Sequence, residues 1–204
     1  MKALLKKIVG LLGLLCHLVF SGCSPEHAPD QVLQVVTVKQ FEKFVAETGY
    51  VTDAEQFGWS IVQKDVFNFT TVDGANWRNP DGLNPPASPS LPVTQVSYND
   101  AVAYCKWSRT ALPTYEQYWE LIQPDERMVV TNLNAPISSA ETVNILGNVW
   151  EITAPVDGEA IRLAGGSLFC SPRTCHGTSK ARKLYVDKQT GNLHIGFAVI
   201  LAVQ

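Results

Sequence analysis

The stretch that decides the fold runs from residue 92 to residue 107 and reads Pro92-Val93-Thr94-Gln95-Val96-Ser97-Tyr98-Asn99-Asp100-Ala101-Val102-Ala103-Tyr104-Cys105-Lys106-Trp107. Ser97 and Asp100 form a capping box, in which each side chain satisfies a backbone N–H at the start of a helix. Ala101, Tyr104 and Cys105 recur at helical spacing and therefore share one apolar face. The stretch predicts an amphipathic helix that opens at Ser97 and packs on a core.

Two further helices carry the same signal. Thr37 with Gln40 opens one that ends at Gly49, and Thr114 with Gln117 opens another that ends before Pro124. Their expected inward faces are Phe41, Phe44 and Val45 in the first, and Tyr118, Leu121 and Ile122 in the second.

Short strands are expected in four places, and long loops rich in glycine, proline and asparagine separate the elements, notably Val72–Pro92. The expected strands are Val32–Val36, Val149–Thr153, Ile161–Ala164 and Ile195–Val203. Few regular elements among long loops indicate an α+β domain whose function is built from loops.

The N-terminus has the pattern of an export signal. A cationic start is followed by the apolar run Ile8–Phe20, which is shorter than the ~20 residues of a permanent membrane span. The run ends in Phe20-Ser21-Gly22-Cys23, which resembles a bacterial lipobox, so we expect lipidation at Cys23. An ordinary secretory signal cut nearby, or a short anchor helix, is the alternative. Ser24 after the cysteine favours the outer membrane, facing the periplasm.

These signals divide the chain into three parts. Residues 1–23 are the predicted lipoprotein signal peptide, residues 24–33 a tether, and residues 34–204 one domain. The 16 Lys and Arg against 19 Asp and Glu leave a net charge of −3, which does not favour a nucleic acid as partner. With Cys16 removed and Cys23 acylated, the domain keeps Cys105, Cys170 and Cys175, an odd number, so at least one thiol stays unpaired within a monomer.

Two of those thiols follow a tight turn. The stretch reads Gly165-Gly166-Ser167-Leu168-Phe169-Cys170-Ser171-Pro172-Arg173-Thr174-Cys175. Cysteines this close can form a disulfide, which the space beyond the inner membrane permits, or bind a soft metal ion as thiolates. The residues alone leave both open. Cys105, on an apolar helix face, is expected to be a buried small hydrophobe.

Several stretches, in order along the chain, resemble the formylglycine-generating enzyme family, also called the sulfatase-modifying-factor family. They are Thr37–Glu55, Phe57–Ser60, Gly74–Gly82, Pro92–Trp107, Leu112–Thr114, Gly147–Glu151 and the region of Cys170 and Cys175. The resemblance covers the chain from about Gln34 to the C-terminus and implies a C-type-lectin-like fold.

The resemblance also implies a reaction. Family members oxidise a cysteine of a client polypeptide to formylglycine with dioxygen and a Cu(I) ion held by two thiolates. By family position, Cys170 and Cys175 would bind the copper, and Ser167 and Trp150 would line the oxygen pocket. A Cys170–Cys175 disulfide remains the competing interpretation, and the two can coexist as resting and active forms.

A calcium site is implied in the same way. Asn144 and Glu151 would supply side-chain oxygens, and Gly147 and Val149 backbone carbonyls. Oxygen-only ligands in a loop suit Ca²⁺. The alternative is a solvated glutamate beside a core tryptophan.

The chain departs from the family where arginines are expected: it has Ala111, Ala164 and Ala198 instead. Their loss, and the expected anchor, favour a second hypothesis: a non-catalytic lipoprotein that binds a periplasmic partner or copper. A third is assistance in maturing another periplasmic metalloenzyme. Trp59 and Trp77 are expected in a client groove or in the core, and His194 as a structural histidine.

Overall fold

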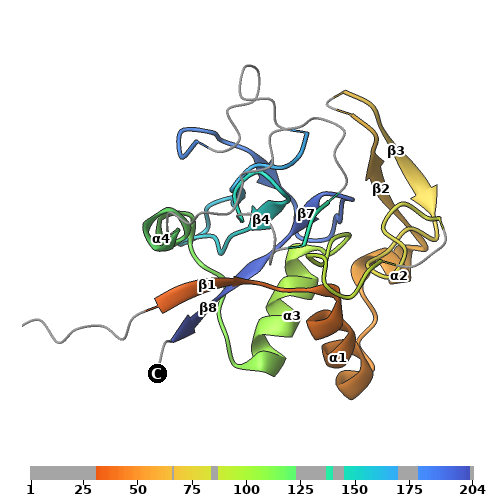
Figure 1. Cartoon of the computed structure of the whole chain (residues 1–204), viewed down its shortest axis with the longest axis horizontal. Helices are drawn as coiled ribbons and strands as arrows, with labels where there is room; N and C mark the ends of the chain where they lie inside the picture. Colours follow the sequence, from red (N-terminus) through yellow and green to blue (C-terminus); the bar gives the residue numbers. More distant parts are fainter. Residues whose placement is uncertain are drawn as a thin grey trace, which may run out of the picture.

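The structure is a computed structural model that describes residues 31–65, 67–83, 87–122, 137–139, 145–169 and 179–202. Among these residues, the helices lie in the first part of the chain, and five consecutive strands follow the last helix (Figure 1). The helices are α1 (Val38–Thr48), α2 (Asp53–Phe57), α3 (Tyr98–Ser108) and α4 (Tyr115–Leu121). The strands are β1 (Gln31–Val35), β2 (Trp59–Gln63), β3 (Phe69–Asp73), β4 (Trp150–Ile152), β5 (Ile161–Ala164), β6 (Tyr185–Val186), β7 (Ile195–Gly196) and β8 (Ala198–Ala202).

The described strands form three small sheets. β1 pairs antiparallel with β8, β2 pairs with β3 as a hairpin, and the third sheet has the order β6-β5-β4-β7. The sequence predicted a single strand over Ile195–Val203, but the structure divides this run between two sheets. Ile195 and Gly196 pair parallel with β4, whereas Ala198–Ala202 pair with β1. Phe197, fully buried, lies at the switch between the two sheets. The α+β class expected from the sequence is confirmed.

The three predicted capping boxes are present. Thr37, Ser97 and Thr114 each accept a hydrogen bond from the backbone three residues later. α1 ends at Gly49, whose φ of 67° is the left-handed conformation that glycine adopts without strain. Tyr118 is buried as predicted, but Leu121 and Ile122 are only half-buried, because α4 ends there. β1 begins at Gln31, inside the segment predicted as a tether.

An aromatic cluster forms the core between α1 and α3. The ring centroid of Phe41 lies 5.3 Å from those of Phe44 and Trp77, and 6.3 Å from that of Phe197. Trp77 is 1% exposed and therefore a core residue, not part of a client groove. Trp59 is 39% exposed on β2. Burying several aromatic side chains together supplies much of the stability that so loop-rich a chain needs.

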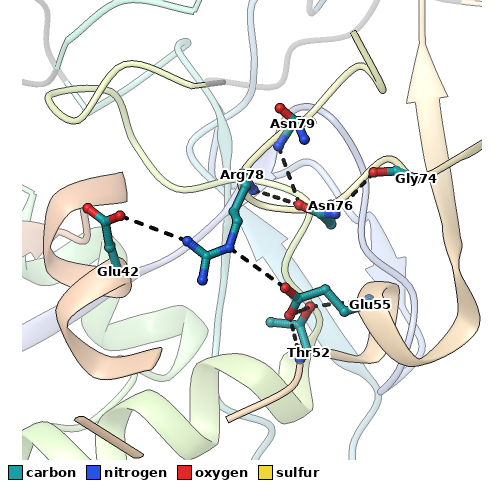
Figure 2. Close-up of polar contacts among 7 residues, drawn as sticks. All are labelled: Glu42, Thr52, Glu55, Gly74, Asn76, Arg78 and Asn79. Carbon is teal, nitrogen blue, oxygen red and sulfur yellow. Dashed lines mark hydrogen bonds and ion pairs between the residues drawn. The ribbon is translucent and has the colours of Figure 1, made fainter. Parts of the chain in front are cut away.

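Polar contacts join α2 to α1 and to the loop after β3 (Figure 2). Glu55 accepts hydrogen bonds from the backbone N–H (2.9 Å) and the hydroxyl (2.8 Å) of Thr52, the N-cap of α2. Arg78 faces Glu55 at 4.0 Å and Glu42 of α1 at 3.8 Å, and its guanidinium lies 4.0 Å from the Trp77 ring. Arg78 therefore links its loop to both α1 and α2 through ion pairs.

Replacing Thr52 with alanine is expected to lower the free energy of unfolding by about 1 kcal/mol, because the first turn of α2 loses its cap. Thr52 is fully buried, so water cannot replace the lost hydroxyl. Urea denaturation of Thr52→Ala and of Thr52→Ser, which keeps the hydroxyl, measures the difference. Equal destabilisation of both variants would assign the effect to the missing methyl group instead.

The two ends of the described chain lie together. Gln31 pairs with Ala202 at the edge of the β1–β8 sheet, and the β2–β3 hairpin lies on the opposite side of the molecule (Figure 1). Among the described residues, no helix has the length and apolar character needed to cross a membrane.

Candidate functional site

Trp150 and Ser167 line one cavity of about 330 Å³. Trp150 lies on β4, and Ser167 follows β5 after the two glycines. Because β4 and β5 are paired antiparallel, both residues lie on the same cavity although they are separated along the chain. Sequence reasoning placed both in one pocket, and the structure brings them together.

The Gly-Gly turn before Ser167 requires glycine. Gly165 and Gly166 have φ values of 82° and 74°, in the left-handed region that side chains disfavour. A Cβ on Gly165 would also collide with the hydroxyl of Tyr118 on α4. The backbone N–H of Gly147 donates to the carbonyl of Gly165 at 2.8 Å, which joins this turn to the loop before β4.

A buried histidine forms the polar wall of the cavity. Nδ1 of His194 lies 2.7 Å from Oγ of Ser167, and Nε2 contacts Oε1 of Gln63 on β2. Burial lowers the pKa of His194 to about 3, so its imidazole is neutral. Sequence reasoning took His194 as a structural histidine and did not single out Gln63. No local signal could have paired them, since they are 131 residues apart.

Three of the four residues expected to bind calcium are described. Gly147 and Val149 precede β4, and Glu151 lies on it. Glu151 is fully buried, and neither carboxylate oxygen has a hydrogen-bond partner among the described residues. Burial raises the pKa of Glu151 to about 8. This excludes the solvated glutamate considered from the sequence. The fourth residue, Asn144, lies outside the described residues.

The predicted copper ligands are also outside the described residues, as is the lipidation site Cys23. The described chain reaches Phe169, one residue before Cys170, and Phe169 lines the cavity with Ser167. Cys105 is buried on α3, as expected, and burial raises the pKa of its thiol. Within the described ranges, no three His, Cys, Asp or Glu side chains are grouped as metal ligands.

A second cavity, of about 540 Å³, adjoins the first and shares Gln63 and Phe169 with it. Leu83 lies on its wall and is 65% exposed, and Phe69, on the wall of the first cavity, is 68% exposed. Phe69 and Leu83 are therefore large apolar side chains exposed beside a concave site.

Comparison with known proteins identifies the family. The Sulfatase-modifying factor enzyme 1-like domain matches residues 33–121. The bovine formylglycine-generating enzyme is 42% identical, over 79% of this chain and 62% of its own. The mouse inactive C-alpha-formylglycine-generating enzyme 2 is 41% identical, over 77% of this chain and 68% of its own.

The chain belongs to the formylglycine-generating enzyme family. It spans somewhat less than two thirds of the bovine enzyme. PvdO from Pseudomonas aeruginosa has a similar fold, with a TM-score of 0.53 and 15% identity over 83% of this chain and 78% of its own. The fold and family that the motifs predicted are therefore confirmed. Family membership does not by itself establish the oxidation reaction, because the name of the mouse relative records an inactive protein.

Proposed function

We propose that the protein is a copper-dependent oxidase of the formylglycine-generating type, which oxidises a cysteine of an exported client polypeptide with dioxygen. One observation carries the proposal: Trp150 and Ser167, assigned from family position to the oxygen pocket, line a single cavity. Phe169 on the wall of the same cavity is the residue before Cys170 in the sequence.

The donor chemistry fits copper. Cys170 and Cys175 offer two thiolates, which are soft ligands that favour Cu(I) over hard cations. The ion would supply the chemistry that activates dioxygen and accepts the client thiol. The chain's own residues would position the reacting groups: Trp150 is 3% exposed and Ser167 is fully buried, so both lie on the inner wall of the cavity.

The client would approach from the side of the β2–β3 hairpin. The exposed rings and aliphatic groups there, Phe69 and Leu83, adjoin the two connected cavities. An extended polypeptide could cover them while its cysteine enters the smaller cavity. A small-molecule thiol would leave this apolar surface uncovered, so a cysteine-containing polypeptide is the better partner.

Calcium would serve as the second ion. Glu151 is a buried carboxylate without a hydrogen-bond partner among the described residues, and such a group is costly unless a cation neutralises it. Ca²⁺ accepts carboxylate and carbonyl oxygens, which Glu151, Asn144, Gly147 and Val149 can provide. Its role would be structural, because Glu151 lies on β4 beside Trp150.

The location is proposed from the N-terminal pattern alone. A lipid on Cys23 would anchor the domain to the outer membrane, facing the periplasm. The competing function is a non-catalytic lipoprotein of the same fold that binds a periplasmic partner or copper, or assists another metalloenzyme. The mouse relative, whose name records inactivity, supports this non-catalytic alternative.

The deciding experiment supplies a client. The full chain in detergent, reduced anaerobically and loaded with Cu(I), is mixed in air with a Cys-x-Pro-x-Arg peptide. We expect dioxygen uptake, release of the cysteine sulfur as hydrogen sulfide, and a peptide mass loss corresponding to conversion of the CH2–SH group to an aldehyde. A thiol reductant added to the assay supplies the two further electrons that reduce dioxygen to water. A peptide with serine in place of the cysteine should remain unchanged. Copper uptake without peptide conversion would favour the non-catalytic alternative.

A further inference from the structure

A chain of hydrogen bonds passes along the cavity wall from β2 to Ser167. The side-chain amide of Gln63 donates through Nε2 to the carbonyl of Asp65 at 2.9 Å, which turns its Oε1 toward His194. Nδ1 of His194 lies 2.7 Å from Oγ of Ser167. The backbone N–H of Phe169 also donates to that oxygen, at 3.4 Å.

These contacts fix the direction of each proton. An amide oxygen only accepts, so the ring N–H of His194 must be on Nε2, facing Gln63. A neutral imidazole carries one proton, so Nδ1 is an acceptor. The hydroxyl of Ser167 therefore donates to Nδ1. If Nδ1 carried the proton instead, the lone pair of Nε2 would face the oxygen of Gln63, which is unfavourable.

The histidine is held rigidly enough to impose this direction. Its ring meets Phe169 edge-on, with centroids 4.8 Å apart, and only 4% of the residue is exposed. Its backbone carbonyl accepts the N–H of Trp150 at 2.9 Å. One residue thus contacts Trp150 through its backbone and Ser167 through its side chain.

We propose that His194 is the positioning residue of this site: by accepting the Ser167 proton, it holds the hydroxyl so that serine acts toward the cavity as a hydrogen-bond acceptor. The inference deepens the oxidase proposal and rests on it. Any group that Ser167 contacts in the cavity must then be a donor. A group that keeps its proton, such as an N–H, meets this requirement, whereas a bare oxyanion or a metal-bound thiolate does not.

The proton positions can be measured without turnover. Nitrogen-15 NMR of the histidine-labelled full chain distinguishes a protonated ring nitrogen from an unprotonated one, and loss of signals in His194→Asn assigns the residue. We expect the Nε2–H form of His194 at neutral pH. An Nδ1–H form would overturn the inference even if the protein oxidises its client.

The kinetic test uses two replacements of similar size. His194→Asn keeps an oxygen acceptor near the position of Nδ1, whereas His194→Leu removes every polar atom. We expect His194→Leu to lower kcat by about 10- to 100-fold with KM nearly unchanged, as is typical when a supporting hydrogen bond is lost. His194→Asn should recover most of that loss.

A purely structural role predicts a different pattern. Both variants would then lose stability, and their activity would follow the folded fraction measured by thermal denaturation. Equal kcat in the folded portions of both variants would overturn the inference. Should the wild type fail to oxidise any peptide, the oxidase proposal fails, and the NMR experiment still decides the position of the proton.

Discussion

Replacing Cys170 and Cys175 together with serine is expected to abolish Cu(I) binding and, with it, client oxidation. A serine hydroxyl has nearly the size of a thiol but is a hard, protonated ligand, whereas Cu(I) favours soft thiolates. We expect one copper per wild-type chain and none in the double variant, a loss of more than about 100-fold in affinity by the same preference. Copper measured after anaerobic reduction and desalting gives the result.

Cys105→Ala is the matched control. Cys105 is 8% exposed on α3, and burial raises the pKa of its thiol, so it is a poor metal ligand. This variant should bind copper like the wild type. If the double serine variant still holds one copper per chain, the ligands lie elsewhere and the oxidase proposal loses its basis.

Single serine variants separate the copper site from the competing disulfide. If Cys170 and Cys175 form a disulfide in air, the denatured, unreduced wild type shows fewer reactive thiols than after reduction. Cys170→Ser would then release the thiol of Cys175 and lower stability by roughly 2 kcal/mol or more under oxidising conditions, because the closed loop is lost. Unchanged stability of the variant, together with a wild-type thiol count that is the same before and after reduction, would exclude the disulfide.

Calcium is expected to stabilise the protein strongly, through Glu151. At a free concentration 100 times the dissociation constant, the ion contributes about 2.7 kcal/mol, which corresponds to an increase of roughly 5–10 °C in Tm. Calcium would supply a partner for a fully buried carboxylate that has none among the described residues. Differential scanning calorimetry with and without EGTA measures the change.

The calcium-free protein should also depend on pH in a defined direction. The folded-state pKa of Glu151, about 8, lies above its ordinary value of 4.5, so the folded state favours the protonated form. That contribution to stability is complete below about pH 4.5 and is lost as the pH rises through about 8. Added calcium should therefore stabilise the protein more at pH 9 than at pH 6.

Glu151→Gln removes the charge while keeping the shape. This variant should lose both the calcium response and the pH dependence, whereas Glu159→Gln, at an exposed position, should keep both. A calcium response that survives in Glu151→Gln would place the ion at another site.

Local signals predicted the helices well. A capping box and a terminal glycine involve residues close in sequence, which is why α1, α3 and α4 could be located before the structure was known. α2 carries the same signal in Thr52 and Glu55 but has only five residues, too few for an apolar periodicity to reveal it.

The β2–β3 hairpin was missed for a different reason. An inward-facing position of β2 is polar: Ser60 is 3% exposed and bonds to Gln95, which is 35 residues away. β2 alternates in burial, but its sequence does not alternate apolar and polar residues, and most of β3 is exposed on both faces. Neither strand therefore shows the sequence alternation that indicates a half-buried strand. Because β2 was not predicted, its residue Gln63 and the contact of Gln63 with His194 were not predicted either.

The functional site, like the fold, was predictable only where its residues lie close together in the sequence. Ser167, Trp150 and Glu151 could be named because they lie in short motifs, and the structure places two of them on one cavity. The partner of Ser167 depends on segments that meet only after folding. Non-local contacts of this kind leave no trace in a single sequence.

The pairing of the first strand with the last has a consequence for how a tethered molecule would face its surroundings. Both ends of the described chain lie at the edge where Gln31 meets Ala202, and the hairpin beside the cavities lies at the far side (Figure 1). A lipid on Cys23, as proposed, would leave the two cavities on the side away from the bilayer. Substrates would then reach the cavities from solution and not from the lipid surface.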